Sequence, residues 1–379
     1  MSVPVAAAAA TGRWAEVDLG AVRANVRQLL GRLPDGCRLI AVVKADAYGH
    51  GARPVAGAVL EAGAWGLAVS TPEEALSLVD LCGGERLLIM GGLAPSSCEA
   101  AVRVGCAVVC SAPWMVEALE AVVPAGRRLP VHLEIDTGLH RLGCAEEEAP
   151  RLASRIAGSG RLRLAGTMTH FASSDSDPRF TRLQLERFLE TLSRFDVDPG
   201  IRHAANSWAI LRHPEAALDA VRPGIALYGC AGQLRPALAL HALVTQVRDV
   251  RSGHSVGYGR TWIAPRPARI ATVAIGYEDG IMRSRSNRGH VLVRGVRAPL
   301  VGRVSMDSIT VDVSDVPDVE PGDPVTLIGG GITAEEVAAW SGTIPYEVLT
   351  SLGNRVARVY RETAERTVPT GDRARGQEE

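Results

Sequence analysis

The chain has 379 residues, enough for one large domain and a smaller one. Hydrophobic residues make up 46% and charged residues 22% of it, an ordinary composition for a globular protein. The formal net charge of -1 argues against general binding to nucleic acid or acidic membranes, which usually needs a basic surplus. No apolar run approaches the ~18–20 residues of a membrane span. The seven cysteines are scattered without a CxxC pair, which favours reduced thiols in a cytoplasmic protein.

The two ends of the chain have no pattern typical of a folded element. Met1 to Ala10 is small and apolar but lacks the basic start and long apolar core of a signal peptide. We therefore predict a disordered tail over residues 1–12, and a second one over the polar residues 367–379. A helix is expected soon after the first tail, with Asp18 as its N-cap and an apolar stripe at helical spacing.

Short β-rich runs recur eight times in the first two thirds of the chain, mostly separated by amphipathic stretches of helical length. One stretch begins with Thr71 as a possible N-cap, and another spans Arg179 to Phe195. This alternation predicts an α/β protein with a (β/α)8 TIM-type barrel, and a doubly wound sheet is the competing architecture. The expected strands are Leu39–Val43, Gly66–Val69, Leu87–Met90, Ala107–Cys110, Val131–Ile135, Leu164–Thr169, Ile201–Ala204 and Ala220–Arg222.

The pattern changes near residue 240, where turn-separated β segments replace the alternation. We expect the barrel to occupy residues 13–240 and a mainly β C-terminal domain to occupy residues 241–366. A helix from Thr333 to Trp340 interrupts the second domain, and the lack of a Pro/Ser-rich linker predicts close packing of the two. Strands are expected around Val244–Val250 and at Arg269–Ile275, His290–Val293, Ile309–Val313, Val325–Ile328 and Arg355–Tyr360.

Lys44 directly follows the first expected strand of the barrel. In such barrels the chemistry takes place at the carboxyl ends of the strands. The simplest interpretation is a lysine that reaches solvent at the rim, because burying its charge would be costly. The functional interpretation is an amine that forms a Schiff base, which requires a desolvated lysine with a lowered pKa.

Other strand ends also carry polar residues. Arg141 stands between two glycines after the fifth strand, which suggests a tight turn that presents its side chain to the barrel mouth. His170 follows the sixth strand, although a single histidine is more often a hydrogen-bonded core residue than a catalyst. His132, Glu134 and Asp136 share one strand face, but no HxH or HxxxH pattern accompanies them, so we expect no metal site.

The last two strands are followed by residues that suit a phosphate group. Asn206 and Ser207 stand at the expected start of a helix, and Arg222 precedes Gly224 and Ile225. Barrels commonly bind phosphate at this corner, through backbone amides and a helix N-terminus. No GxGxxG or GxxxxGK[ST] motif follows a strand, which argues against a dinucleotide or nucleoside-triphosphate site.

Two tyrosines of the second domain, Tyr258 and Tyr277, are flanked by glycines. They are either turn tyrosines that pack on the surface or positioned, exposed hydroxyls. Together with the barrel-mouth lysine and the phosphate corner, they suit a phosphorylated cofactor held by a lysine. These residues alone do not separate a pyridoxal-phosphate enzyme from a sugar-phosphate aldolase.

Several segments together, in chain order from about Arg13 to Tyr360, resemble the alanine racemases, which are fold-type III pyridoxal-phosphate enzymes. The resemblance implies a barrel followed by a β domain, pyridoxal 5'-phosphate as cofactor, a small amino-acid substrate, and a head-to-tail homodimer whose subunits share active sites. The segments are Val42–Gly51, Asp136–Arg141, Thr169–Ala172, Ala205–Ser207, Arg222–Gly229, Val256–Gly259 and Gly302–Asp307.

The resemblance also implies a role for each matching residue. Lys44 would hold the cofactor and move the α-proton on one face of the substrate, and Tyr258 from the other subunit would act on the opposite face. Arg222 would face the pyridine nitrogen, and His170 would lie behind the cofactor. The cofactor-binding positions are Lys44, Tyr48, Arg141, His170, Asn206, Ser207, Arg222, Gly224, Ile225 and Tyr346. The substrate-side positions are Arg141, Tyr277, Met306 and Asp307.

Glu134 departs from the pattern of the family that the chain resembles. Many members have a carbamylated lysine at this position, whose carboxylate orients the arginine that matches Arg141. We hypothesise that Glu134 takes over this role with a shorter side chain. The departure leaves the substrate open, with alanine favoured over serine or a specialised amino acid.

Two other functions compete with racemisation. A decarboxylase of the same fold type usually lacks the glycine-flanked Tyr258 and the Ser-Met-Asp segment that ends at Asp307. A non-catalytic pyridoxal-phosphate-binding protein is typically a barrel alone.

By analogy with the family, we expect the protein to make D-alanine for peptidoglycan in the cytoplasm. We expect no nucleic-acid or membrane partner.

Overall fold

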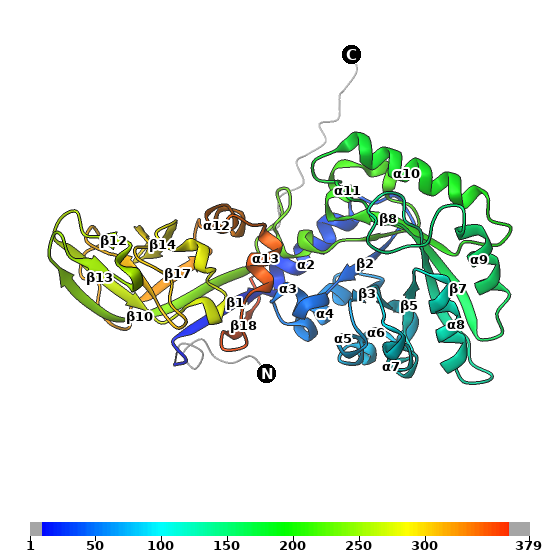
Figure 1. Ribbon diagram of the computed structural model, residues 1–379, viewed down its shortest axis with the longest axis horizontal. Coiled ribbons are helices and arrows are strands. Elements are labelled where there is room, and N and C mark those ends of the chain that lie inside the picture. The colour runs from blue at the N-terminus through cyan, green and yellow to red at the C-terminus, as the bar shows by residue number, and fades with distance from the viewer. Residues whose placement is uncertain (1–9, 364–379) are drawn as a thin grey trace, which may run out of the picture.

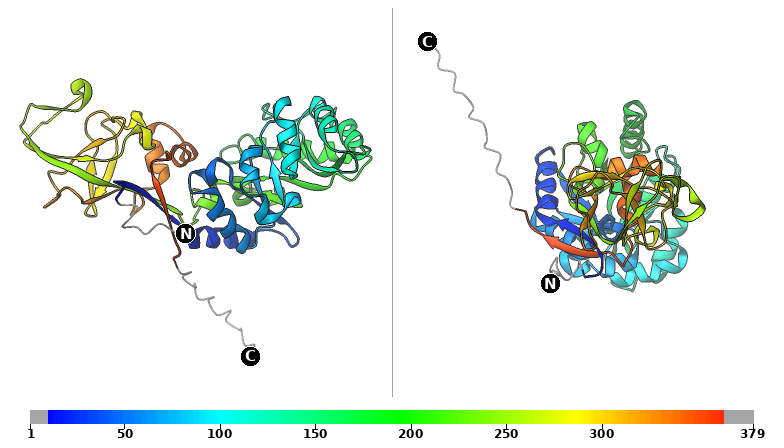
Figure 2. Two further views of the ribbon diagram at one scale, coloured as in Figure 1. Left: turned by 90° about the horizontal axis from the view of Figure 1, so that it is seen from below. Right: turned by 90° about the vertical axis from the view of Figure 1, so that its left-hand side faces the viewer.

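The computed structural model describes residues 10–363, so most of both expected tails lies outside the described residues. The described part of the chain forms two lobes that lie side by side along one long axis (Figure 1). The same separation is visible from below (Figure 2). Buried apolar side chains nevertheless form one continuous cluster that runs through the barrel lobe into the β lobe. The lobes are therefore packed against each other, as the lack of a linker-like segment indicates.

The barrel lobe contains eight parallel strands that close on themselves in chain order. Closure is made by β9 and β2, where Leu39 pairs with Val221. Most residues of the eight strands are apolar and buried, as parallel strands covered by helices require. The barrel expected from the sequence is thus confirmed, and the doubly wound sheet is excluded. The strands are β2 (Arg38–Val42), β3 (Gly66–Val69), β4 (Leu87–Ile89), β5 (Ala107–Cys110), β6 (Leu129–Glu134), β7 (Leu162–Met168), β8 (Ile201–Asn206) and β9 (Ala220–Arg222).

Helices cover the outside of the barrel, and several begin at the capping residues expected from the sequence. Asp18 accepts a hydrogen bond from the backbone of Ala21 at 3.0 Å, and Thr71 forms a capping box with Glu74. The helices of this lobe are α2 (Leu19–Leu30), α3 (Lys44–Tyr48), α4 (Ala52–Glu61), α5 (Pro72–Leu76), α6 (Val79–Cys82), α7 (Cys98–Val104), α8 (Pro113–Val122), α9 (Ala149–Ala157), α10 (Pro178–Ser193) and α11 (Ser207–Arg212), with short 3-10 turns η1 (Gly84–Arg86), η2 (Pro95–Ser97), η3 (Pro214–Ala216) and η4 (Ile225–Tyr228).

The β lobe is built on an eight-stranded sheet, together with a two-stranded sheet of β11 and β12. Its central strand β10 pairs with β1, β13 and β17. Residues 13–18 were expected in the barrel domain, but they form β1 between β10 and β18. The strands are β1 (Arg13–Asp18), β10 (Leu238–Val250), β11 (Ser255–Val256), β12 (Trp262–Ile263), β13 (Ala268–Val273), β14 (His290–Val293), β15 (Val296–Pro299), β16 (Ile309–Asp312), β17 (Pro324–Ile328) and β18 (Ala357–Arg361).

Two helices of the β lobe lie near the junction of the lobes, α12 (Ala334–Ser341) and α13 (Pro345–Thr350). Thr333 caps α12, close to the expected start of this helix. The close approach of α13 to α3 brings the backbone carbonyl of Leu349 within 2.3 Å of where a Cβ on Gly49 would lie. The β lobe thereby contributes to the carboxyl end of the barrel. It also contains the 3-10 turns η5 (Tyr258–Arg260), η6 (Tyr277–Asp279) and η7 (Arg283–Arg285).

Candidate active site

Lys44 lies at the carboxyl end of β2, where the backbone takes an unusual course. The four residues after it all have φ between 52° and 54°, so α3 contains a left-handed turn, which costs L-residues about 1–2 kcal/mol each. Two carboxylates hold this turn. Glu74 accepts a hydrogen bond from the backbone of Ala45 at 2.7 Å, and Asp46 accepts one from Ala52 at 2.7 Å. Such strain is stored where surrounding contacts fix a functional geometry.

The environment of Lys44 favours its neutral amine. Burial lowers the pKa of Lys44, the charge of Arg141 lowers it further, and Glu74 opposes this shift. Lys44 is also the only lysine among the 379 residues. All the other residues counted together as lysine and arginine are arginines. Arginine cannot act as a nucleophilic amine. Lys44 therefore carries the only lysine amine of the chain.

Arg222, at the end of β9, is 2% exposed, lines the cavity that contains Lys44, and has one unused donor. Its Nη1 donates to Nδ1 and to the carbonyl of His203, both at 2.7 Å. Its Nη2 donates to the carbonyls of Thr169, at 2.7 Å, and Ala204, at 3.2 Å. The buried Nε has no hydrogen-bond partner among the described residues. Since a guanidinium has five N–H donors, one remains for an acceptor in the cavity that Arg222 lines.

A pair of buried histidines holds Arg222 from behind. Because Arg222 can only donate, Nδ1 of His203 must accept, and its Nε2 then donates to Nδ1 of His132 at 2.7 Å. Burial lowers the pKa of His132 to about 3 and that of His203 well below its usual value, with a further contribution from Arg222. Both imidazoles are therefore neutral at neutral pH, and they fix the direction of the guanidinium.

The loops after β8 and β9 form the corner that was expected to suit phosphate. Ser207 Oγ accepts hydrogen bonds from the backbone N–H groups of Gly224, at 2.9 Å, and Ala226, at 3.2 Å. A Cβ on Gly224 would lie 2.5 Å from the hydroxyl of Tyr48, so a larger residue there would displace the Tyr48 side chain. Asn206 caps α11 by accepting from Ala209 at 3.1 Å. The corner thus gathers backbone donors, hydroxyls and a helix start.

These groups surround a single cavity of about 340 Å³ at the carboxyl end of the barrel. The structure brings together in it all ten residues that the sequence assigned to cofactor binding, and it adds four that were not expected. It combines an amine, a free donor on a buried guanidinium and a phosphate-type corner, which fits a phosphorylated pyridine aldehyde. The lining residues are Val42, Lys44, Ala45, Tyr48, Met90, Arg141, His170, Asn206, Ser207, Arg222, Gly224, Ile225, Tyr346 and Thr350.

Glu134 and Arg141 lie near each other but do not pair. Glu134 is 4% exposed, and its Oε2 has no hydrogen-bond partner in the described part of the chain. Burial raises the pKa of Glu134, while the charges of Arg222 and Arg141 lower it. Within residues 10–363, neither a hydrogen bond nor an ion pair joins Glu134 to Arg141. No direct bond between the two side chains is therefore present in the described part of the chain, and the role of Glu134 in orienting Arg141 stays a prediction.

His170 lies in the same cavity and is neutral. Burial lowers its pKa to about 3, and the positive charges of Arg222, Arg141 and Lys44 act in the same direction.

The predicted catalytic Tyr258 and three of the substrate-side residues lie in the β lobe, outside this cavity, whereas the fourth, Arg141, lines it. Tyr258 is 73% exposed in η5, Tyr277 is 41% exposed in η6, and Met306 is 51% exposed. The segments that carry Tyr277 and Met306 are in contact, because the backbone of Tyr277 donates to the carbonyl of Ser305 at 3.0 Å. Tyr258 therefore does not line the Lys44 cavity within the described chain, and its role in the site of another subunit stays a prediction.

A charge network that was not anticipated holds the substrate-side segments together. Asp279 is fully buried and accepts hydrogen bonds from Arg13 at 2.7 Å, Arg355 at 3.0 Å and the backbone of Gly276 at 2.9 Å. Arg355 also donates to Asp307 at 2.8 Å. The network joins residues far apart in the sequence, and no local sequence pattern predicts such partners.

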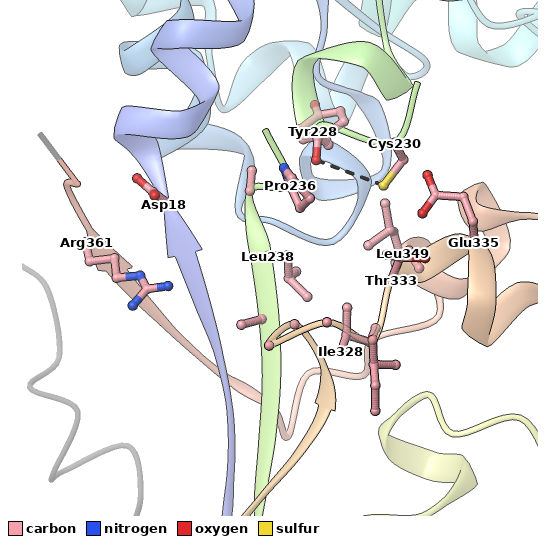
Figure 3. Close-up of a pocket in the computed structure, with 17 residues that line it drawn as sticks. Asp18, Tyr228, Cys230, Pro236, Leu238, Ile328, Thr333, Glu335, Leu349 and Arg361 are labelled. Carbon is pink, nitrogen blue, oxygen red and sulfur yellow. Dashed lines mark hydrogen bonds between the residues drawn. The ribbon is translucent and has the colours of Figure 1, made fainter. Parts of the chain in front are cut away.

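A second cavity of about 340 Å³ lies between the lobes (Figure 3). Its wall includes Tyr228 and Cys230 from the barrel lobe, Leu238 from β10, and Thr333 and Leu349 from the β lobe. Lys44 does not contribute to it, so this cavity is separate from the candidate active site.

Residues 10–363 contain no cluster of three or more histidine, cysteine, aspartate or glutamate side chains able to hold a metal ion. In the same part of the chain, no helix has the length and apolar character needed to cross a membrane. All seven cysteines are free thiols.

The fold and the site are those of a class of barrel enzymes that have a lysine amine in the barrel cavity and a β domain after the barrel. Two family profiles cover nearly the whole described chain, "Alanine racemase, N-terminal domain" at residues 17–232 and "Alanine racemase, C-terminal domain" at residues 237–360. The alanine racemase of Symbiobacterium thermophilum is 43% identical over 367 residues, covering 92% of this chain and 96% of the relative.

Solved structures agree with these matches. The alanine racemase of D-cycloserine-producing Streptomyces lavendulae has a TM-score of 0.88 and 39% identity, covering 93% of this chain and 97% of its own. That of Bartonella henselae, solved with covalently bound pyridoxal phosphate, has a TM-score of 0.85 and 32% identity, covering 92% and 99%. The chain belongs to the alanine racemase family, which confirms the resemblance inferred from the sequence motifs.

Proposed function

We propose that the protein is a pyridoxal-phosphate-dependent racemase that interconverts L-alanine and D-alanine. The observation that carries this proposal is the cavity in which the amine of Lys44, the free Nε–H of Arg222 and the corner around Ser207 converge. Each group suits one part of the cofactor: its aldehyde, its ring nitrogen and its phosphate. When bound, the cofactor makes the α-proton of an amino acid acidic by accepting electron density.

The residues around the cavity account for the binding and orientation of this cofactor. Lys44 would hold it covalently, while the backbone of Gly224 and Ile225 and the hydroxyls of Tyr48, Ser207 and Tyr346 would take the phosphate. Arg222 offers a cation at the ring nitrogen, and the neutral His132–His203 pair offers it no proton to pass on. A ring nitrogen that stays unprotonated limits side reactions. Asn206 and His170 would complete the binding site.

Racemisation needs a proton to leave one face of the α-carbon and another to arrive on the opposite face. Two bases achieve this without turning the substrate over. We propose that Lys44 Nζ serves one face and that Tyr258 Oη of the partner subunit serves the other, in a head-to-tail homodimer. The exposure of Tyr258, Tyr277 and Met306 on one lobe supports this arrangement. Arg141 and Asp307 would then lie near the substrate carboxylate.

Glu134 is proposed to act on Arg141 through its charge instead of through a direct bond. We expect Glu134→Gln to lower kcat/KM about 10-fold, because it removes a charge near Arg141 without changing the side-chain size. The isosteric variant should leave the fold intact, which the melting temperature checks. Unchanged turnover and unchanged cofactor affinity in Glu134→Gln would contradict this role.

The test of the proposed function is chiral analysis of a panel of L-amino acids incubated with purified protein and pyridoxal phosphate. We expect D-alanine to dominate and the two enantiomers to approach equal amounts. In deuterated water, two bases should place deuterium on the product while early recovered substrate keeps its proton. Inversion of serine alone would change the substrate but keep the chemistry. Release of carbon dioxide, or binding of cofactor without inversion, would overturn the proposal.

Production of D-alanine would suit the supply of a peptidoglycan precursor in the cytoplasm. A comparison of D-alanine requirement between cells with and without the gene separates this role from one in a specialised pathway.

A further inference from the structure

Arg285 is a buried cation in the β lobe whose hydrogen-bonding capacity is mostly unused. It ends η7 and is 1% exposed. Its Nη2 donates to the carbonyl of His290 at 3.1 Å, and its guanidinium carbon lies 5.3 Å from the ring centre of Trp340. Both Nε and Nη1 are buried without a hydrogen-bond partner in the described part of the chain. Two donors of one buried side chain therefore lack acceptors.

The charge of Arg285 also lacks a counter-charge. Burial alone lowers its pKa to about 10, with no contribution from a carboxylate, so the side chain stays charged at neutral pH. Among residues 10–363, no acidic side chain forms an ion pair with it. Arg358 offers a contrast, because it donates to the carbonyls of Gly49, Leu352, Gly353 and Val356. Buried charges in proteins are normally paired in some way.

A small cavity of about 10 Å³ borders Arg285, enough for one particle close to the size of a water molecule. Apart from Arg285 and Ser341, its wall is apolar or glycine, and includes Ile281, Val337 and Leu352. Ser341 Oγ already donates its proton to a backbone carbonyl of α12. A water molecule would find few acceptors for its hydrogens here, and a cation would be repelled. Because Arg285 lines the cavity and has unpartnered N–H groups, a polarisable monatomic anion there would find donors and tolerate the apolar wall.

We propose that Arg285 and this cavity form a binding site for one halide ion, chloride under ordinary ionic conditions. The ion would supply the counter-charge of Arg285 and brace the segment that follows the Tyr277 turn, since Ile281 and Gly280 belong to the wall. The site lies in the β lobe and does not include Lys44, so this inference does not depend on the proposed racemase activity.

The first test is thermal unfolding of the full-length, cofactor-loaded protein at constant ionic strength while gluconate is replaced by chloride. We expect the melting temperature to rise by about 2–4 °C with chloride, because a ligand of the native state stabilises it. Bromide should act in the same way. Arg285→Met should abolish the response, since a neutral side chain of similar length needs no counter-ion. Arg288→Met, which removes an exposed arginine nearby, is the matched control and should keep it.

A second test locates the ion directly by anomalous scattering from crystals grown in bromide. We expect a peak next to Nε and Nη1 of Arg285 in the wild type and none there in Arg285→Met. A peak absent from the wild type, a water molecule only at this position, or a chloride response that persists in Arg285→Met would overturn the proposal. If Arg285→Met fails to fold, Arg285→Lys keeps the charge and should retain the halide response.

Discussion

Lys44→Ala is expected to lower racemase activity by at least about 10³-fold, because it removes both the amine that holds the cofactor and one of the two bases. The fold should tolerate the change, since Lys44 is only partly buried and the left-handed turn after it is held by Glu74 and Asp46. Equal melting temperatures of the two proteins would show that the loss is chemical. Retention of more than a few per cent of wild-type activity would contradict the assignment of Lys44.

The same variant allows a readout that does not rely on turnover. Reduction of the cofactor-loaded protein with borohydride should add one cofactor mass to the wild type and none to Lys44→Ala. Because Lys44 is the only lysine, no other lysine side chain can compete for the cofactor. Lys44→Arg is the matched control, since it keeps the positive charge but provides no nucleophilic amine. A small added amine such as methylamine should partly rescue Lys44→Ala, but not Lys44→Arg, where the cavity is filled.

The barrel could be predicted from the sequence because its signals are local. Each strand is a short apolar run, such as Gly66–Val69 and Ala107–Cys110, and both have the predicted bounds in the structure. Residues directly after these strands must then meet at one end of the barrel, which is why Lys44, Arg141 and Ser207 could be grouped there before any coordinates. Tyr48 and Tyr346 were added through the resemblance to the family. The order of the motifs along the chain, which resembles that of the family, indicated the chemical role of each residue. Strand position alone does not indicate these roles.

Interactions between distant residues could not be predicted in this way. Strand β1 joins the second sheet because Arg13–Asp18 pairs with β10 and β18, which lie more than 200 positions later in the chain. The burial of Asp279 between Arg13 and Arg355 is equally non-local. The lack of a bond between Glu134 and Arg141 also depends on how the two side chains lie in three dimensions, which residue type alone does not reveal. Arg285 lies in a segment rich in arginine, a composition typical of an exposed segment. Only the packing in three dimensions shows that Arg285 is buried.

Subunits carrying Lys44→Ala and Tyr258→Phe are each expected to be inactive as homodimers, with a loss of about 10²–10⁴-fold for the tyrosine variant. Their mixed dimer should recover about half of the wild-type activity per dimer, since one site then combines an intact Lys44 with an intact Tyr258 from the other chain. The exposure of Tyr258 and its separation from the Lys44 cavity motivate this expectation. Co-expression with two different affinity tags isolates the mixed dimer for a steady-state assay.

The reverse combination supplies the control. A chain with both Lys44→Ala and Tyr258→Phe, paired with a wild-type chain, has the same total number of altered residues. If sites are shared between subunits, each site of this dimer lacks one of the two groups, and activity should be close to zero. If each chain contained its own complete site, this dimer would be half active and the first mixed dimer would be inactive. The two dimers thus give opposite results under the two arrangements, and a chain that proves to be monomeric would exclude the shared site altogether.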